Sequence, residues 1–149
     1  MWIQLRCTLT IKGLSVVLGA NKIINTKFCE GISDISDSYM GFIIDQWGVL
    51  HDGSHIFDGV LECMQELRER GKFVIILSNS GKRAQQNIDR LTKLGLSPDL
   101  YDHMITSGEV TWQGLHDQTE GYFKDIGKKC IVISRGGDRS IVNDLDVEV

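Results

Sequence analysis

No run of apolar residues in this 149-residue chain approaches the roughly 20 needed to cross a membrane, so we expect no transmembrane helix and no membrane partner. The sequence also lacks any Cys-x-x-Cys pair, internal repeat or low-complexity tract. Its four cysteines stand far apart, which argues against a zinc site or a disulfide framework and predicts free thiols in a reducing compartment. These absences favour an ordinary globular protein of the cytoplasm.

Acidic residues are missing from the first 29 positions. The four basic residues there give the segment a charge of +4, so the remaining residues carry -8 to reach the formal net charge of -4. A net acidic chain gives no reason to expect a nucleic-acid partner. The acid-free start has features of an organelle transit peptide, and the alternative is an unstructured extension or a wrongly assigned start. We favour an extension over residues 1–30, because no clear cleavage site follows the apolar stretch within it.

From residue 31 onward, short apolar runs alternate with amphipathic stretches. The spacing predicts strands at Phe42–Ile44, Phe73–Leu77 and Met104–Ile105, and helices that carry Val60 to Leu67, Ala84 to Leu94 and Val110 to Leu115. Gly71 and Gly95 end the first two helices, and Thr106 stands three residues before Glu109 in the spacing of a capping box. This alternation predicts an α/β fold in which helices flank a parallel sheet.

Polar residues follow the first two predicted strands directly. Asp45 ends the first strand, and Ser78 with Asn79 ends the second. Because the carboxyl ends of parallel strands meet at one edge of a sheet, we expect Asp45 and Ser78 to lie close together. A carboxylate there can act as a nucleophile or a Mg²⁺ ligand, while nearby hydroxyl and amide groups, including the amide of Gly48, donate to phosphoryl oxygens. The structural alternative is an aspartate that only caps the next turn.

Several segments, in this order and spacing, resemble the haloacid dehalogenase (HAD) superfamily of hydrolases, and in particular its subfamily IIA. They are Asp45–Leu50 with Gly53 and Gly59, the helix end Leu67–Lys72, the loop Ser78–Ser80 before Arg83, Leu94–Leu96 and Thr106–Glu109. The resemblance covers roughly residues 31–149. Residues 31–126 would then be the N-terminal part of a HAD-like core, and residues 127–149 the start of a cap domain at which the chain is truncated.

The resemblance implies a Rossmann-like core and a magnesium-dependent phosphatase that acts on a small phosphorylated metabolite through an aspartyl-phosphate. Carried over by position, Asp45 would be the nucleophile and a ligand of Mg²⁺, and the backbone carbonyl of Trp47 would be a second ligand. Ser78 would bind the transferring phosphoryl group with Asn79 beside it, and Gly48 would form the turn next to the nucleophile. A partial core leaves apolar surface exposed, which would favour either association into a homo-oligomer or poor solubility.

The chain departs from the family pattern in two respects. Trp47 stands two residues after the nucleophile, where phosphatases of the superfamily carry an aspartate as general acid and base, and loss of such a group costs a factor of about 10²–10⁴ in rate. His51 or Asp52 could substitute, although a role in the turn is the simpler interpretation. The later lysine and acidic metal-binding loop of the superfamily have no match. The alternative function is a catalytically weak or inactive fragment that binds a phosphate ligand or a partner protein.

Overall fold

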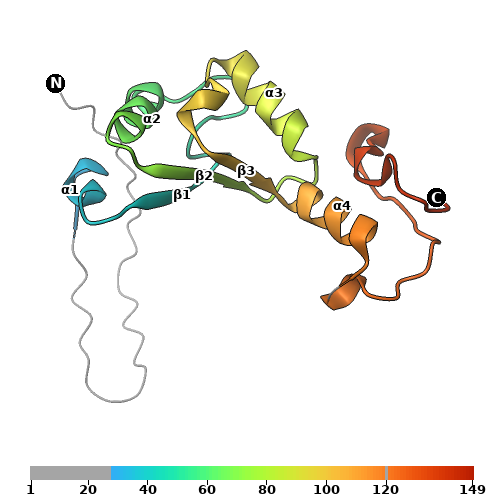
Figure 1. Cartoon of the computed structure of the whole chain (residues 1–149). Coiled ribbons are helices and arrows are strands. Elements are labelled where there is room, and N and C mark those ends of the chain that lie inside the picture. The colour runs from blue at the N-terminus through green and yellow to red at the C-terminus, as the bar shows by residue number, and fades with distance from the viewer. Residues whose placement is uncertain (1–27, 120) are drawn as a thin grey trace.

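The computed structural model describes residues 28–119 and 121–149, and within them three strands form one parallel sheet (Figure 1). The strands are β1 (Gly41–Asp45), β2 (Phe73–Ser78) and β3 (His103–Thr106), in the order β1-β2-β3. Each predicted strand is present and extends one residue further at both ends or at its carboxyl end. The α/β fold with a parallel sheet is therefore confirmed. The proposed extension over residues 1–30 lies almost entirely outside the described residues.

A helix follows each strand, as the periodicity predicted. α2 (Val60–Glu69) follows β1, α3 (Ala84–Leu94) follows β2, and α4 (Ser107–Asp117) follows β3. The shorter elements are α1 (Ser33–Ser36) and single 3-10 turns at Pro98–Leu100, Gly121–Phe123, Arg135–Gly137 and Ser140–Val142. None of the helices in the described ranges is long and apolar enough to cross a membrane.

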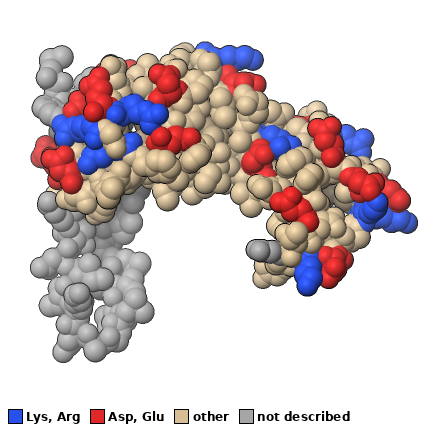
Figure 2. Space-filling view, viewed as in Figure 1, with Lys and Arg blue, Asp and Glu red and all other residues tan. Residues whose placement is uncertain are grey.

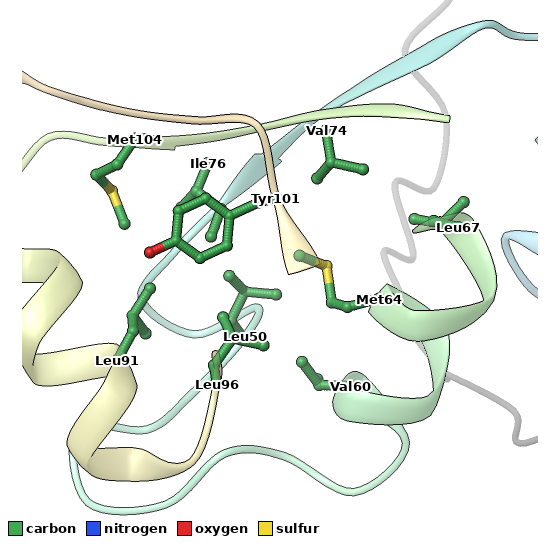
Figure 3. Close-up of a cluster of buried hydrophobic side chains, with 10 residues drawn as sticks. All are labelled: Leu50, Val60, Met64, Leu67, Val74, Ile76, Leu91, Leu96, Tyr101 and Met104. Carbon is green, nitrogen blue, oxygen red and sulfur yellow. The ribbon is translucent and has the colours of Figure 1, made fainter. Parts of the chain in front are cut away.

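The hydrophobic core lies between the sheet and the two helices α2 and α3, which cover the same face (Figures 1 and 3). Val74 and Ile76 of β2 are completely buried there, because alternate side chains of a strand point to one face. The ten core residues are Leu50, Val60, Met64, Leu67, Val74, Ile76, Leu91, Leu96, Tyr101 and Met104. The core therefore fixes the sheet against two helices that both start on the side where the strands end.

The other face of the sheet is open. Ile43 is 70% exposed, and Phe73, Leu77 and Ile105 of the same face are also exposed. The apolar run Phe42–Ile44 is therefore only partly covered: Phe42 and Ile44 are half-buried, and Ile43 is exposed because no described helix packs on its side. Parallel sheets normally have both faces covered, which explains why the strand sequences are apolar throughout. The expected self-association stays a prediction.

Charged side chains are distributed in mixed groups on the surface. Figure 2 shows acidic and basic residues side by side near α2 and again over the segment after α4, with a mostly uncharged stretch between them. The cysteines of the described part, Cys29, Cys63 and Cys130, are free thiols, as predicted. Burial raises the pKa of the Cys63 thiol, so this thiol remains protonated at neutral pH.

Asp102 joins the start of β2 to the segment before β3. Its Oδ2 accepts a hydrogen bond from the backbone amide of Val74 at 2.7 Å, and its Oδ1 accepts one from Nη1 of Arg68 at 2.7 Å. The Val74 amide, and next the Arg68 guanidinium, hold the pKa of Asp102 below its ordinary value. The ionised carboxylate is therefore part of what holds the amino end of the sheet together.

The depressed pKa of Asp102 predicts a loss of stability in acid. This pKa is lower in the folded chain than in the unfolded one. The contribution of the Asp102 carboxylate to the free energy of unfolding is therefore complete above about pH 4, and it disappears as the pH falls through the pKa of the folded chain. Asp102→Asn should reduce the midpoint of urea unfolding at pH 7 and flatten its decline in acid. Asp58→Asn, on the exposed loop before α2, is the control. Parallel acid profiles for native and Asp102→Asn protein would contradict the assignment.

Candidate active site

The register of the strands brings Asp45 next to Ser78. Asp45 pairs with Leu77 of β2, and Ser78 pairs with Thr106 of β3. Asp45, Ser78 and Thr106 are the last residues of β1, β2 and β3, so they lie on one edge of the sheet. The prediction that Asp45 and Ser78 come together at this edge is confirmed, and Thr106 is a third polar residue there.

The two side chains begin from opposite faces of the sheet. Asp45 is exposed and belongs to the open row with Leu77 and Ile105, whereas Ser78 and Thr106 are 6% and 0% exposed in the row covered by helices. The alternation of a strand is the reason, since Ser78 is one residue beyond the partner of Asp45. A ligand that meets both groups must therefore bind at the rim, where the strands end.

The carboxylate of Asp45 has one oxygen engaged. Its Oδ1 accepts a hydrogen bond from the backbone amide of Gln46 at 2.8 Å. Within residues 28–119 and 121–149, no hydrogen bond is made to Oδ2 of Asp45 or to the carbonyl oxygen of Trp47. Two such oxygens fit the hard, few-ligand coordination that Mg²⁺ takes from proteins, completed by water and phosphate. The described part of the chain contains no cluster of three or more His, Cys, Asp or Glu side chains suited to a metal.

The turn after Asp45 is closed by its own backbone. The amide of Leu50 donates to the carbonyl oxygen of Gln46 at 2.9 Å, and the amide of Gly48 donates to the carbonyl oxygen of His51 at 2.8 Å. Gly48 has a φ of 79°, a left-handed conformation that favours glycine. Its amide is therefore committed to the turn in this structure. The predicted contact of Gly48 with a ligand would need this hydrogen bond to be shared or exchanged.

His51 and Asp52, the two candidate substitutes for a general acid, are also committed to the turn. Oδ1 of Asp52 accepts hydrogen bonds from the amides of Ser54 (2.7 Å) and His55 (2.8 Å), and these two bonds lower the pKa of Asp52. His51 is 1% exposed, and its Nδ1 accepts a hydrogen bond from the amide of Gly53 at 2.8 Å. Burial, and next the charge of Arg90, lowers the pKa of His51, so its imidazole is neutral. The turn role proposed from the sequence agrees with these contacts.

Trp47 lies over the hairpin that follows Asp45. Its side chain is exposed, and a Cβ placed on Gly53 would lie 3.4 Å from the indole Nε1 and 3.3 Å from Nη2 of Arg90. Nη2 of Arg90 donates to the carbonyl oxygen of Gly53 at 2.8 Å. Arg90 therefore belongs to this neighbourhood, although 37 residues separate it from Gly53 and nothing in the sequence pattern links them.

The sequence that carries these strand ends is similar to a known protein family. Residues 42–148 match the family model described as haloacid dehalogenase-like hydrolase. This chain belongs to that family. The candidate site lies inside the region of the haloacid dehalogenase-like chain that matches the family, because the matched range includes Asp45, Trp47 and Ser78.

Two relatives extend the comparison. The haloacid dehalogenase-like chain is 25% identical over 119 residues to phosphoglycolate phosphatase 2 of Arabidopsis thaliana, covering 79% of this chain and 37% of the relative. Its fold is similar, with a TM-score of 0.67 and 27% identity, to the crystal structure of a haloacid dehalogenase-like hydrolase from Brucella suis 1330. That match covers 79% of this chain and 42% of the other. The chain thus spans less than half the length of either relative.

Proposed function

We propose that this chain carries the nucleophile and the phosphate-binding edge of a magnesium-dependent phosphatase of subfamily IIA, acting on a small phosphorylated metabolite through an aspartyl-phosphate. One observation supports the proposal most: Asp45 pairs with Leu77, so Asp45 and Ser78 end two neighbouring parallel strands at the same edge of the sheet. We also propose that the protein works in a reducing compartment, the cytoplasm, which suits its scattered thiols; the alternative is an organelle, if residues 1–29 are a transit peptide.

The proposed chemistry uses the chain's own groups as follows. A carboxylate oxygen of Asp45 attacks phosphorus, the bond from phosphorus to the leaving oxygen breaks, and water later hydrolyses the acyl phosphate to restore Asp45. The hydroxyl of Ser78 and the amide side chain of Asn79 donate to the phosphoryl oxygens, on which negative charge is concentrated. A magnesium ion, held by Asp45 and the carbonyl oxygen of Trp47, would supply the positive charge that lets two anions meet.

The substrate class is supported by the relatives and by the chemistry of the edge. Phosphoglycolate phosphatase 2, as its name says, acts on a small phosphorylated acid, and 25% identity supports the class rather than that compound. Because the chain spans 37% of this relative and 42% of the Brucella hydrolase, the activity of the whole protein is part of the proposal.

A second candidate function is a catalytically weak or inactive domain that binds a phosphate ligand or a partner protein. Trp47 favours it, since an indole cannot transfer a proton and both His51 and Asp52 are engaged in the turn. The phosphate-binding form of the second candidate differs from the enzyme in turnover but shares its phosphate-binding edge. They are therefore separated by comparing turnover with the trapping of a phosphate analogue.

Asp45→Asn tests the nucleophile. With Mg²⁺ and a generic phosphate monoester, we expect phosphate release by the native chain and none above background by Asp45→Asn, since an amide cannot form the acyl phosphate. Asp58→Asn, which removes an exposed carboxylate on the loop before α2, should behave as the native chain does. Equal release by native and Asp45→Asn protein would rule out the enzyme. Binding of beryllofluoride that requires Asp45 and Mg²⁺, without turnover, would select the second candidate.

A further inference from the structure

The segment between β2 and α3, residues 79–83, lies against the start of α4. The amide of Gly108 donates to the carbonyl oxygen of Ser80 at 3.0 Å, and Oγ1 of Thr106 donates to the carbonyl oxygen of Lys82 at 2.8 Å. Gly108 is buried, and a Cβ there would come within 2.3 Å of the carbonyl oxygen of Gly81. The segment is thus held at a separation that only glycine permits.

Glu109 of α4 accepts three hydrogen bonds, two from the last residue of this segment and one from the first residue of α3. Its Oε1 accepts from Nη2 of Arg83 and its Oε2 accepts from Nε of Arg83, each at 2.8 Å. The same Oε2 accepts from the amide of Ala84, the first residue of α3, at 2.9 Å. Arg83, at the N-cap position of α3, makes no capping hydrogen bond of its own, so Glu109 caps α3 from a different helix.

The pair of Arg83 and Glu109 is partly shielded from water. The guanidinium of Arg83 lies 3.8 Å from the centroid of the Trp112 ring, and the side chains of the ion pair are 24% and 31% exposed. The hydrogen bonds with Arg83 lower the pKa of Glu109, and those with Glu109 raise the pKa of Arg83, so both are ionised at neutral pH. A fork-to-fork contact of this kind is stronger and more directional than a single surface ion pair.

We propose that Glu109 is a positioning residue for the phosphate-binding edge: through Arg83 and Ala84 it fixes residues 79–83, the segment that begins with Asn79 and directly follows Ser78. The inference rests on the proposed function, because it assigns Ser78 and Asn79 to the phosphoryl group. Ser78 also receives a hydrogen bond from within the segment, since the amide of Ser80 donates to its Oγ at 3.3 Å. A shift of about 1 Å in such groups can cost a factor of about 10² in a reaction that depends on their placement.

Glu109→Gln tests this role with orthovanadate and Mg²⁺ as the probe. We expect vanadate to bind the full chain about tenfold more weakly after Glu109→Gln, which keeps the shape of the side chain but breaks the charged fork. Glu109→Asp keeps the charge and should cause a smaller loss of affinity than Glu109→Gln. Glu66→Gln is the matched control, because Glu66 also accepts from an arginine, Nε of Arg70 at 2.7 Å, on α2 away from the strand ends. Titration calorimetry gives the affinities.

Amide hydrogen exchange in the ligand-free chain separates positioning from general loosening. Glu109→Gln should speed exchange at Ser80 and Gly108, which do not bond to Glu109, more than at Ile76 in the core. Unchanged vanadate affinity, or equal effects at all three amides, would overturn the positioning role while the proposed function stands. If native and Asp45→Asn chains both fail to bind vanadate, the proposed function falls, and the positioning role falls with it.

Discussion

Trp47→Asp is expected to raise phosphate release by about 10²-fold or more, because it restores a group that can give a proton to the leaving oxygen and take one from the attacking water. The site tolerates the change on structural grounds. The side chain of Trp47 is 63% exposed, so its removal uncovers little of the core. The carboxyl would stand two residues from Asp45, on the same turn.

The comparison that decides this prediction uses two substrates and one matched variant. An alkyl phosphate has a poor leaving group and should gain more from Trp47→Asp than p-nitrophenyl phosphate, whose leaving group departs without help. Trp47→Asn has the same shape as Trp47→Asp but no proton to transfer, and it should show no gain. Equal rates for the two variants would mean that removal of the indole, rather than proton transfer, is responsible.

Gly108→Ala is expected to destabilise the fold by about 2 kcal/mol. A Cβ at this position would lie 2.3 Å from the carbonyl oxygen of Gly81 and 2.5 Å from that of Lys82, and both are backbone atoms that cannot rotate away. Overpacking of this kind costs about 1–3 kcal/mol. The substitution would also weaken the hydrogen bond from the amide of Gly108 to the carbonyl oxygen of Ser80, which adds about 1 kcal/mol. These costs exceed the gain of about 1 kcal/mol that alanine brings to a helix.

Gly114→Ala in the same helix is the control for Gly108→Ala. There the added Cβ would come within 2.4 Å of the ring of Phe123, a side chain that can turn aside. Both substitutions replace glycine by alanine in α4, so a larger fall in the urea midpoint for Gly108→Ala reports the backbone clash. Gly108→Ala should also weaken vanadate binding, because the displaced segment begins with Asn79 and directly follows Ser78. Equal midpoints for the two variants would contradict the close packing seen at Gly108.

The capping box of α4 shows how far sequence reasoning reached at this edge. The spacing of Thr106 and Glu109 predicted that Thr106 caps the helix, and Oγ1 of Thr106 accepts from the amide of Glu109 at 3.0 Å. The reciprocal half of the box is absent, because the Glu109 carboxylate bonds to Arg83 and Ala84 instead. A charged fork competes well with a single backbone amide, and no local pattern shows that Arg83 comes within reach.

The sequence by itself determined the elements of this protein and the place of its carboxylate. Apolar periodicity and glycine stops are local properties, so they located β1, β2 and α3 within one or two residues. The parallel arrangement of successive strands then brought Asp45 and Ser78 to one edge.

Only the tertiary structure decided which face of the sheet is open, that Arg90 supports the turn at Gly53, and that Glu109 holds the segment after Ser78. The last two depend on contacts between residues 25 or more positions apart. Such contacts form when whole elements pack against each other, and the residue spacing within a single element carries no record of them.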